Sequence, residues 1–143
     1  MTPLFYLSDS PIPPKPGKYP GDVGIDLAVD IPERRAILPG HGQFLPAGFQ
    51  AQLPYGHCAL VLPRSSTNQA GLLVMTGVID TGYSGVIGMQ VHNITCDPIW
   101  IEPGQRLAQL VLFEGVYPSP VPVARFNPTD RGANGWGSSG GSV

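Results

Sequence analysis

Glycine and proline punctuate this chain so densely that it has no room for long helices. The 143 residues include 19 glycines and 17 prolines, about a quarter of the total. Glycine weakens a helix, and proline breaks it. Hydrophobic residues still make up 42% of the chain, which is enough to build a core. Because the apolar runs between the breaks are short, we expect one all-β domain with many turns.

Short strands are expected wherever apolar and polar residues alternate between turn residues. The sequence indicates one helical turn, Thr67–Ala70, with Ser66 as its N-cap and Gly71 as its stop. The proline-rich Ser8–Gly21 is expected to be an extended loop, and the proline-broken Val116–Val123 an edge strand or a linker. Strands are expected at Met1–Leu7, Asp22–Asp30, Gln43–Leu53, Gly56–Leu62, Leu72–Ile79, Val86–Ile94, Ile99–Ile101 and Gln105–Phe113.

The segment Gly77–Asn93 joins two of these strands through a turn rich in Gly, Asp and Thr, which is typical of a β-hairpin. Asp80 follows the apolar Val78 and Ile79, which should partly desolvate its carboxylate, and Tyr83 lies just past the tip. A carboxylate at such a rim is a candidate catalytic acid or base. The alternative is that Asp80 only accepts hydrogen bonds from turn amides.

A second candidate site is a possible anion site at the predicted helical turn. Arg64, Ser65 and Ser66 precede it, and a helix N-terminus with these side chains suits an anion. The alternative is an ordinary cap beside a surface arginine. Gln109 is predicted to face inward among apolar residues, where its amide needs a partner. The alternative there is a satisfied core amide.

Acidic residues at even spacing mark the strand Asp22–Asp30. Asp22, Asp26 and Asp30 would share one strand face, and the simplest interpretation is a solvated face. Asp26 fits that interpretation least well, because it stands between Ile25 and Leu27.

The last 17 residues differ in composition from the rest of the chain. They contain five glycines and one large apolar side chain, Trp136, which predicts a flexible segment. Glycine amides, serine hydroxyls and Arg131 are also the groups with which a loop wraps a phosphate. A disordered tail is the alternative. We therefore divide the chain into a β-barrel domain, 1–126, and a flexible glycine-rich tail, 127–143.

Charge and cysteine usage exclude several classes of partner. The formal net charge of -2 predicts no sequence-independent binding to nucleic acid. No apolar run reaches the roughly 20 residues of a membrane span, and no signal pattern opens the chain, so we expect no membrane association and a cytoplasmic location. Cys58 and Cys96 are expected to be buried thiols rather than a disulfide, and they form no zinc spacing with the three histidines.

Five stretches together resemble, in order and spacing, the five motifs of the homotrimeric dUTP pyrophosphatases, the dUTPases. The resemblance implies a jelly-roll-like β-subunit with one short helix, three copies of which share three active sites. It also implies Mg²⁺-dependent hydrolysis of dUTP at the α-phosphate to dUMP and pyrophosphate, which limits uracil incorporation into DNA and supplies dUMP. The stretches are Asp22–Val29, Pro63–Leu72, Gly77–Gly88, Gly104–Leu112 and Arg131–Gly140.

The same resemblance implies a role for each candidate residue. Asp80 matches the aspartate that activates the attacking water, and Tyr83 matches the tyrosine that packs on the deoxyribose and excludes a 2′-hydroxyl. The positions that would enclose uracil are Gly77, Val78, Ile79 and Gly88. Arg64, Ser65, Ser66 and Gln109 match phosphate contacts, and Asp26 would lie in the water shell of the Mg²⁺. In the tail, which would close over an active site, Arg131, Ser138 and Ser139 would hold the γ-phosphate and Trp136 would cover uracil.

The chain departs from the family pattern at three positions. Trp136 stands where Phe is usual, and stacking should survive the change. Val74 stands where some members have Asn, so base recognition would rest on the backbone. Val86 follows Gly85 where an acid or amide is common.

The sequence leaves two alternative functions open. A dCTP deaminase of the same fold would need an added acid near the base, but Asp97 and Glu102, the next acids after Tyr83, lie in turns. A nucleotide-dependent module that binds a regulatory protein partner is the second alternative, although no surface insertion is evident.

Overall fold

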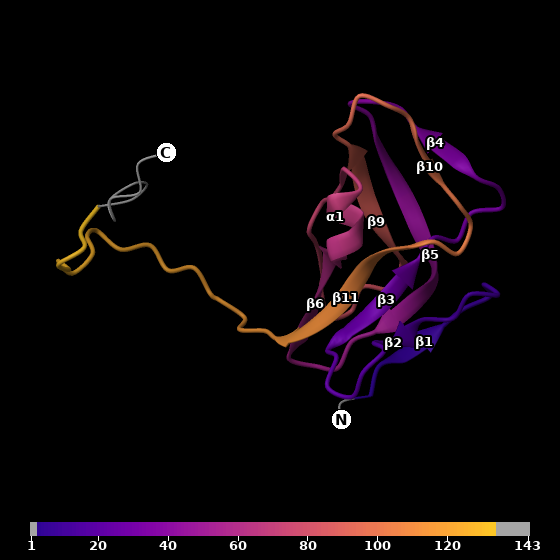
Figure 1. Cartoon of the computed structure of the whole chain (residues 1–143). Helices are drawn as coiled ribbons and strands as arrows, with labels where there is room; N and C mark the ends of the chain where they lie inside the picture. Colours follow the sequence, from indigo (N-terminus) through magenta and orange to yellow (C-terminus); the bar gives the residue numbers. More distant parts are fainter. Residues whose placement is uncertain (1–2, 134–143) are drawn as a thin grey trace.

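The computed structural model describes residues 3–133, which form two antiparallel β-sheets with one short helix beside them (Figure 1). The first sheet has the strand order β1 (Phe5–Leu7), β5 (Gly42–Gln52), β9 (Val86–Asn93), β7 (Leu72–Val74). The second has the order β2 (Lys15–Pro16), β3 (Gly24–Ala28), β11 (Arg106–Glu114), β6 (His57–Pro63), β8 (Gly77–Ile79). A separate ribbon pairs β4 (Arg35–Ile37) with β10 (Ile99–Ile101), and helix α1 covers Ser65–Gln69. The all-β prediction is confirmed.

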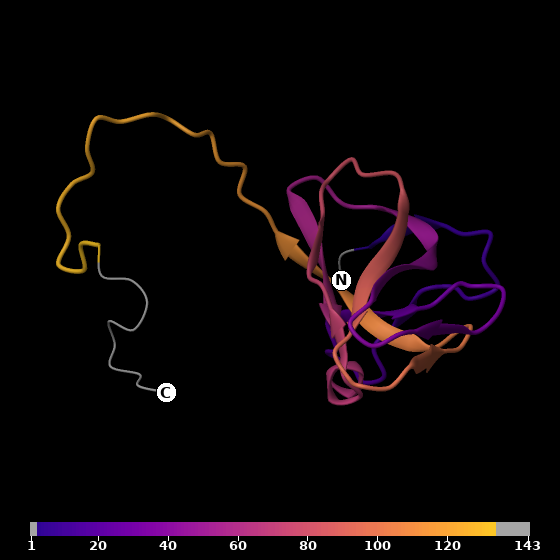
Figure 2. The ribbon, with the colours of Figure 1, turned by 90° about the horizontal axis from the view of Figure 1, so that it is seen from above.

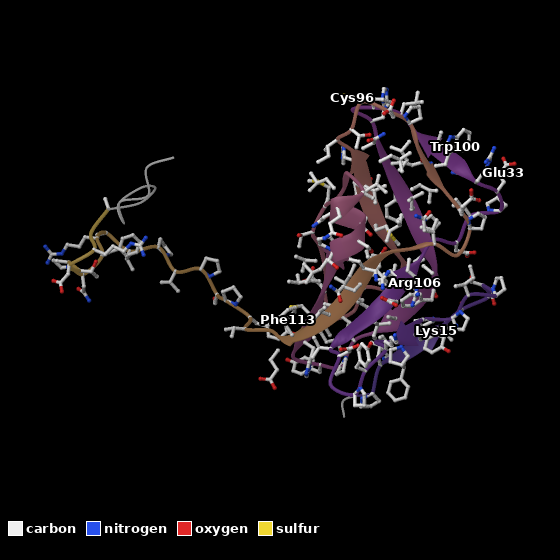
Figure 3. The ribbon with its side chains drawn as sticks, viewed as in Figure 1. Lys15, Glu33, Cys96, Trp100, Arg106 and Phe113 are labelled. Carbon is white, nitrogen blue, oxygen red and sulfur yellow. The ribbon has the colours of Figure 1, made fainter. Side chains whose placement is uncertain are left out.

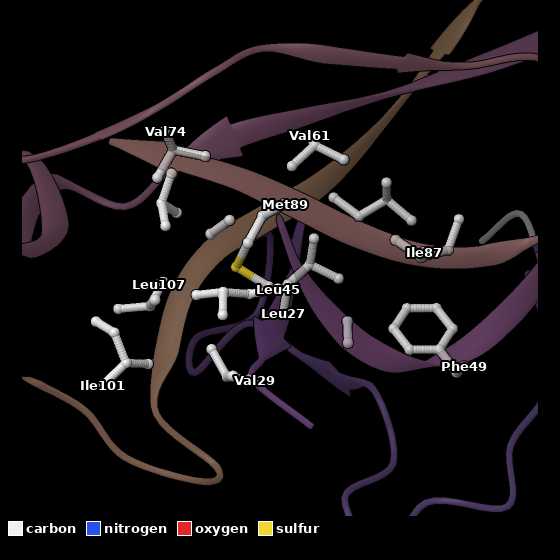
Figure 4. Packing of buried hydrophobic residues seen from close by; sticks show 14 of the residues in the cluster. Leu27, Val29, Leu45, Phe49, Val61, Val74, Ile87, Met89, Ile101 and Leu107 are labelled. Atoms are coloured by element: carbon white, nitrogen blue, oxygen red, sulfur yellow. The ribbon is translucent and has the colours of Figure 1, made fainter. Parts of the chain in front are cut away.

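The core lies between the sheets, because the side chains that point inward from both are apolar. Along β9 every second residue is buried, as the two-residue period of a strand requires. Leu45 and Phe49 of β5 and Met89 of β9 meet Leu27 of β3 and Val61 of β6 in this space (Figure 4). All five side chains are at most 2% exposed.

A buried amide joins the β4–β10 ribbon to the sandwich. Asn93 ends β9 and is 1% exposed. Its Nδ2 donates to the carbonyls of Ile37 (2.8 Å) and Asp97 (2.7 Å). Its Oδ1 accepts from the amide (2.9 Å) and the hydroxyl (2.7 Å) of Thr95. The polar group is thereby satisfied, as burial demands.

The predicted strand Leu72–Ile79 is in fact two strands in different sheets. β7 pairs with β9, which confirms half of the predicted hairpin, but β8 pairs with β6 instead of β9. Met75 and Thr76 between them are both exposed, so the alternation changes phase there and the chain crosses from one sheet to the other. The hairpin prediction was wrong for this half because local sequence pattern does not reveal which sheet a strand joins.

The predicted helical turn exists, but its N-cap was wrong. Helix α1 begins at Ser65, and its N-cap is Arg64, whose backbone is still extended after β6 and whose side chain makes no capping hydrogen bond. Ser66 therefore lies inside the first turn instead of capping it. The helix ends before Gly71, as predicted.

Other differences concern short elements and exposure. The strands β2, of two residues, and β4, of three, were not predicted. Both cysteines are free, as predicted, but neither is fully buried: Cys58 is half-buried, and Cys96 is exposed because it lies in the turn before β10.

The C-terminal part of the described chain lies outside the sandwich. After β11 ends at Glu114, residues 115–133 form no strand or helix. Gly115 and Tyr117 still contact the loop before β6, and the chain then runs away from the body (Figures 1 and 2). Val116–Val123 is thus a linker, one of its two predicted forms. The division of the chain at residue 126 stays a prediction. Among residues 3–133, no helix is long and apolar enough to cross a membrane.

Candidate active site

Most of the described candidate residues line one of two hollows that share no lining residue. The first, called here the arginine hollow, is lined by Asp26, Arg64, Ser65, Arg106 and Gln109 together with the loop 17–24. The second, the Tyr83 hollow, is lined by Val61, Gly77, Ile79, Tyr83, Val86 and Gly88, with Phe44, Met75, Thr76 and Gln90.

The five-stranded sheet builds the arginine hollow. Asp26 on β3 and Gln109 on β11 are direct cross-strand neighbours. β6 is the other neighbour of β11, and the chain turns from its end into α1, which brings Arg64 and Ser65 to the same place. Residues from three separate stretches, 17–26, 64–65 and 106–109, therefore meet at one end of this sheet.

Asp26 binds two arginines at once. Its Oδ1 lies 3.0 Å from Arg64 Nε, and its Oδ2 lies 2.8 Å from Arg106 Nη1. The Asp26 side chain is only 16% exposed, whereas those of Arg64 and Arg106 are 32% and 54% exposed. Each guanidinium has five N–H donors, more than these contacts use. Two cations around one carboxylate leave excess positive charge in a partly desolvated hollow, which suits a polyanion such as a phosphate chain.

The other residues that were predicted to contact phosphate lie in different environments. Ser65 lines the arginine hollow, whereas Ser66, one residue into α1, is exposed and does not line it. Gln109 is half-buried, and its Nε2 donates to the carbonyl of Pro63 at 3.2 Å. The partner expected for this amide is thus the backbone at the end of β6. A helix of only five residues adds little to anion binding, so the arginines carry that property.

Sequence reasoning missed Arg106, because strict alternation places it on the face opposite Gln109. A register shift between Arg106 and Ala108 in the pairing with β3 inserts one extra residue. This bulge brings Arg106 and Gln109 into the same hollow. Lys18, one of only two lysines, was also missed and lines the hollow from the β2–β3 turn. The scarcity of lysine in the chain is the only sequence signal for it.

The Tyr83 hollow is mainly apolar and small. Its volume is about 210 Å³, below the roughly 300–1,000 Å³ of typical ligand pockets. It draws residues from both sheets, β6 and β8 on one side and β5 and β9 on the other. Val78 points out of β8, is 60% exposed and does not line the hollow, so only its backbone can serve it. The hollow suits one small planar group better than a whole nucleotide.

Gly88 keeps this hollow open. A Cβ at this position would overlap the Phe44 ring and lie 2.8 Å from the carbonyl oxygen of Leu45. The neighbouring strand therefore approaches closely only because residue 88 has no side chain.

Asp80 begins a tight turn that ends at Tyr83. The Tyr83 amide donates to the Asp80 carbonyl at 3.1 Å, and Gly82 supplies a φ of 91°. Asp80 is exposed, and within residues 3–133 its carboxylate accepts no hydrogen bond from the turn amides. The alternative that Asp80 serves only to cap the turn is therefore not supported. The Tyr83 hydroxyl donates to the carbonyl of Val86 at 3.2 Å, which fixes the ring at the rim of the hollow.

The Asp80 turn and the arginine hollow lie at opposite ends of β6. Ile79, just before Asp80, pairs with Ala59, and Arg64 lies five residues further along. At the usual rise per strand residue this separation is about 17 Å. Figure 3 marks the two ends of the neighbouring β11, with Arg106 at the arginine hollow and Phe113 toward the Asp80 end. One chain therefore does not bring Asp80 and the arginines onto the same phosphorus atom.

No protein metal cage is present in residues 3–133, where no three His, Cys, Asp or Glu side chains could hold a metal ion. Both Asp26 oxygens face arginines, so this carboxylate fits a Mg²⁺ only through water, with phosphate oxygens as direct ligands. The role of Asp26 near a metal stays a prediction.

The tail residues are only partly described. Arg131 is exposed and lies in the extended segment beyond the sandwich. Trp136, Ser138 and Ser139 lie outside the described residues, so their predicted roles stay predictions.

Fold and hollows together define a class: an all-β protein with a cationic hollow for a polyanion and a separate apolar hollow beside a carboxylate. The dUTPase family model matches residues 10–140. Deoxyuridine 5'-triphosphate nucleotidohydrolase of Aeromonas hydrophila is 35% identical over 125 residues, covering 85% of this chain and 82% of that protein. The enzyme of the same name from Chlamydia pneumoniae is 37% identical over 133 residues, covering 86% and 88%. The chain therefore belongs to the dUTPase family.

Solved structures agree with this at the level of the fold. The dUTPase of Staphylococcus bacteriophage 80alpha with dUpNHpp has a TM-score of 0.87 at 24% identity and covers 98% of this chain and 99% of that chain. A mutant dUTPase from phage phi11 of S. aureus, whose structure describes the coordination of a structural Mg(II) ion, has a TM-score of 0.79 at 21% identity and covers 89% and 100%. The predicted jelly-roll-like fold is confirmed.

Proposed function

We propose that this member of the dUTPase family hydrolyses dUTP to dUMP and pyrophosphate by attack of water on the α-phosphate. Family membership over most of the chain and the pairing of a cationic hollow with an apolar one support this proposal. The observation that carries it is the Asp26–Arg64–Arg106 cluster, which offers a phosphate chain two guanidinium groups.

In the proposed reaction Asp80 accepts a proton from the attacking water. The new P–O bond forms as the bond from the α-phosphorus to the bridging oxygen breaks, and pyrophosphate leaves with the electron pair of that bond. The Asp80 carboxylate is suited to this step because it projects from the first position of a turn and is not occupied by the turn amides.

Arg64 and Arg106 would stabilise the negative charge on the phosphate chain. Their present partner, Asp26, is an anion of smaller charge, so a triphosphate can take over part of their hydrogen bonding. Ser65 and Gln109 line the same hollow and would orient the chain. Mg²⁺ bound to the triphosphate would neutralise further charge, and Asp26 is the residue we propose for its water shell.

The Tyr83 hollow is our proposed uracil site. Its small volume suits a single ring, and Gly77 and Gly88 leave the strand backbones accessible to the edge of the base. The Tyr83 ring at the rim would pack on deoxyribose and reject a ribose 2′-hydroxyl.

The separation of the Asp80 turn from the arginine hollow supports a shared site. We propose a homotrimer in which the Asp80 turn of one chain faces the arginine hollow of the next. The extended segment 115–133 leaves the body and would carry Arg131 and the following residues to a neighbouring copy. Such an enzyme acts on a soluble nucleotide, in keeping with the predicted cytoplasmic location.

The test is release of pyrophosphate from dUTP, measured beside dCTP, dTTP and UTP, with Mg²⁺ and with excess EDTA. We expect rapid release from dUTP alone and its loss on chelation. Release of ammonia from dCTP would instead support the deaminase. Tight dUTP binding without turnover would contradict the proposal and favour a nucleotide-dependent regulatory module.

A further inference from the structure

Thr81 occupies the second position of the turn that carries both Asp80 and Tyr83. This turn is closed by the bond from the Tyr83 amide to the Asp80 carbonyl. The backbone bond alone sets the shape of the turn but not its orientation on the sandwich. The side chain of Thr81 supplies that orientation, because its Oγ1 donates to the carbonyl of His57 at the start of β6.

A second side chain, that of Tyr117, reaches the same hydroxyl. Tyr117 lies in the first three residues after β11, called here the root of the C-terminal segment. The Tyr117 hydroxyl lies 3.3 Å from Thr81 Oγ1. Since the only proton of Thr81 Oγ1 is used on His57, Tyr117 is the donor and Thr81 the acceptor. The result is a chain of two hydrogen bonds from Tyr117 through Thr81 to His57, in which each bond polarises the next.

The ring of Tyr117 is held as well as its hydroxyl. It stacks on Tyr55, with 6.0 Å between the ring centroids and an interplanar angle of 23°. Two residues earlier, the Gly115 amide donates to the carbonyl of Gly56 at 2.8 Å. The segment that leaves β11 is therefore fixed against the loop before β6 for its first three residues.

Strand order explains why these groups meet. β6 lies between β11 and β8, and its first residues pair with Glu114 on one side and lie next to Ile79 on the other. The end of β11 and the end of β8 thus flank the start of β6. Tyr117 spans this start and contacts the turn that follows β8.

We propose that Thr81 and Tyr117 are positioning residues that couple the root of the C-terminal segment to the turn bearing Asp80 and Tyr83. The proposal rests on the proposed hydrolysis for its effect on turnover, but the coupling itself is a property of the fold. When the bond between Tyr117 and Thr81 is lost, the turn moves more freely on the sandwich and Asp80 is aligned with the attacking water for less of the time.

The kinetic test uses variants that separate the hydroxyl groups from packing. Thr81→Val removes the hydroxyl at nearly constant volume, and Thr81→Ser restores it. For Thr81→Val we expect kcat for dUTP to fall about tenfold or more with KM changed less, and for Thr81→Ser we expect a rate near that of the wild type. Equal losses in both variants, or an unchanged kcat in Thr81→Val with only a lower melting temperature, would overturn the proposal.

Tyrosine variants test the coupling directly. Tyr117→Phe keeps the ring and loses the bond to Thr81, so kcat should fall by a factor of about 2–5, and the double variant with Thr81→Val should be no slower than Thr81→Val alone. Tyr55→Phe is the matched control, because its hydroxyl makes no hydrogen bond in the described part of the chain. Additive losses, or an equal loss in Tyr55→Phe, would contradict the coupling.

A readout without turnover keeps this inference separate from the proposed function. Hydrogen exchange of the Tyr83 amide, measured by NMR, should be faster in Tyr117→Phe and Thr81→Val than in the wild type and in Tyr55→Phe. Unchanged exchange overturns the coupling even if dUTP is hydrolysed. Faster exchange in a protein that does not hydrolyse dUTP would support the coupling and refute the proposed function.

Discussion

Asp80 and Arg106 illustrate how position, rather than residue type, gives a side chain its chemistry. Asp26 and Asp80 are both aspartates in or beside the five-stranded sheet, yet Asp26 binds two guanidinium groups while Asp80 projects from a turn. The first carboxylate organises cations, and the second is available to take a proton. Arg106 acquires its contact with Asp26 only through the bulge in β11.

Replacement of Asp80 by Asn tests its role as the base. Asp80→Asn removes the proton acceptor with little change in shape, so kcat should fall by about 10²–10⁴, while binding of the analogue dUpNHpp is retained. Steady-state kinetics and calorimetry measure the two quantities. Asp97→Asn, in an exposed turn, is the control and should behave as wild type. An unchanged kcat in Asp80→Asn would remove this residue as the base.

Arg106 should contribute to triphosphate binding although sequence reasoning passed over it. For Arg106→Gln we expect KM for dUTP to rise about tenfold, because a charge-assisted hydrogen bond to phosphate is lost. The matched control is Arg34→Gln, since the Arg34 guanidinium stacks on Trp100, 4.5 Å from its centroid, and does not line the arginine hollow. Equal KM values for the two variants would exclude a phosphate contact by Arg106.

At the scale of elements, the two ends of β6 position the arginine hollow and the Asp80 turn. Its C-terminal end leads through Pro63 to Arg64 and α1. Its N-terminal end is flanked by the Asp80 turn and by residues 115–117, which follow β11. A strand in the middle of a sheet is held on both sides, so it provides a rigid base for groups that must keep their positions. The β4–β10 ribbon is joined to the sandwich by the buried Ile37 and Ile101 and by the hydrogen bonds of Asn93.

Loss of the Asn93 side-chain amide should weaken the connection between the β4–β10 ribbon and the sandwich. Asn93→Ala leaves the buried carbonyl of Ile37 and the other former partners without their hydrogen bonds. We expect the free energy of unfolding to fall by about 2–4 kcal/mol. Urea denaturation measures it, with the exposed Asn68→Ala of α1 as the control. A loss no larger than that of the control would show that the amide network contributes little.

At the scale of the molecule, the described chain keeps the Asp80 turn and the arginine hollow apart. The arginine hollow and the Asp80 turn lie at opposite ends of β6, about 17 Å apart at the usual strand rise. Beyond Tyr117 the described chain, up to residue 133, runs away from the body. An assembly of copies would solve this geometric problem, because a neighbour can place its Asp80 turn against the arginine hollow.

Complementation between two inactive variants tests a shared site. Asp80→Asn and Arg64→Gln should each be nearly inactive alone. If each site takes Asp80 from one chain and Arg64 from another, hybrids refolded from an equal mixture should regain about a quarter of wild-type activity by random assortment. Mixing the two folded proteins without refolding is the control. No recovery in verified hybrids would place both residues of a site on the same chain.

The sequence alone determined the fold class and most of the local structure. Its glycines and prolines limit strand and helix length, its alternating runs place the long strands, and Gly71 marks the end of the only predicted helical turn. Through the resemblance to the dUTPases it also led to Asp26, Arg64, Asp80 and Tyr83, but not to Arg106. These properties depend on interactions between residues that are near one another along the chain, so a local pattern carries them.

Only the tertiary structure decided how these pieces meet. It divided Leu72–Ile79 between two sheets, brought Arg106 to Asp26 through a bulge, and placed Tyr117 on Thr81 in the turn that follows β8. It also separated Asp80 from the arginines. Each of these outcomes depends on which strands pair and in what register, and that choice is made by the packing of the whole core rather than by any short stretch of sequence.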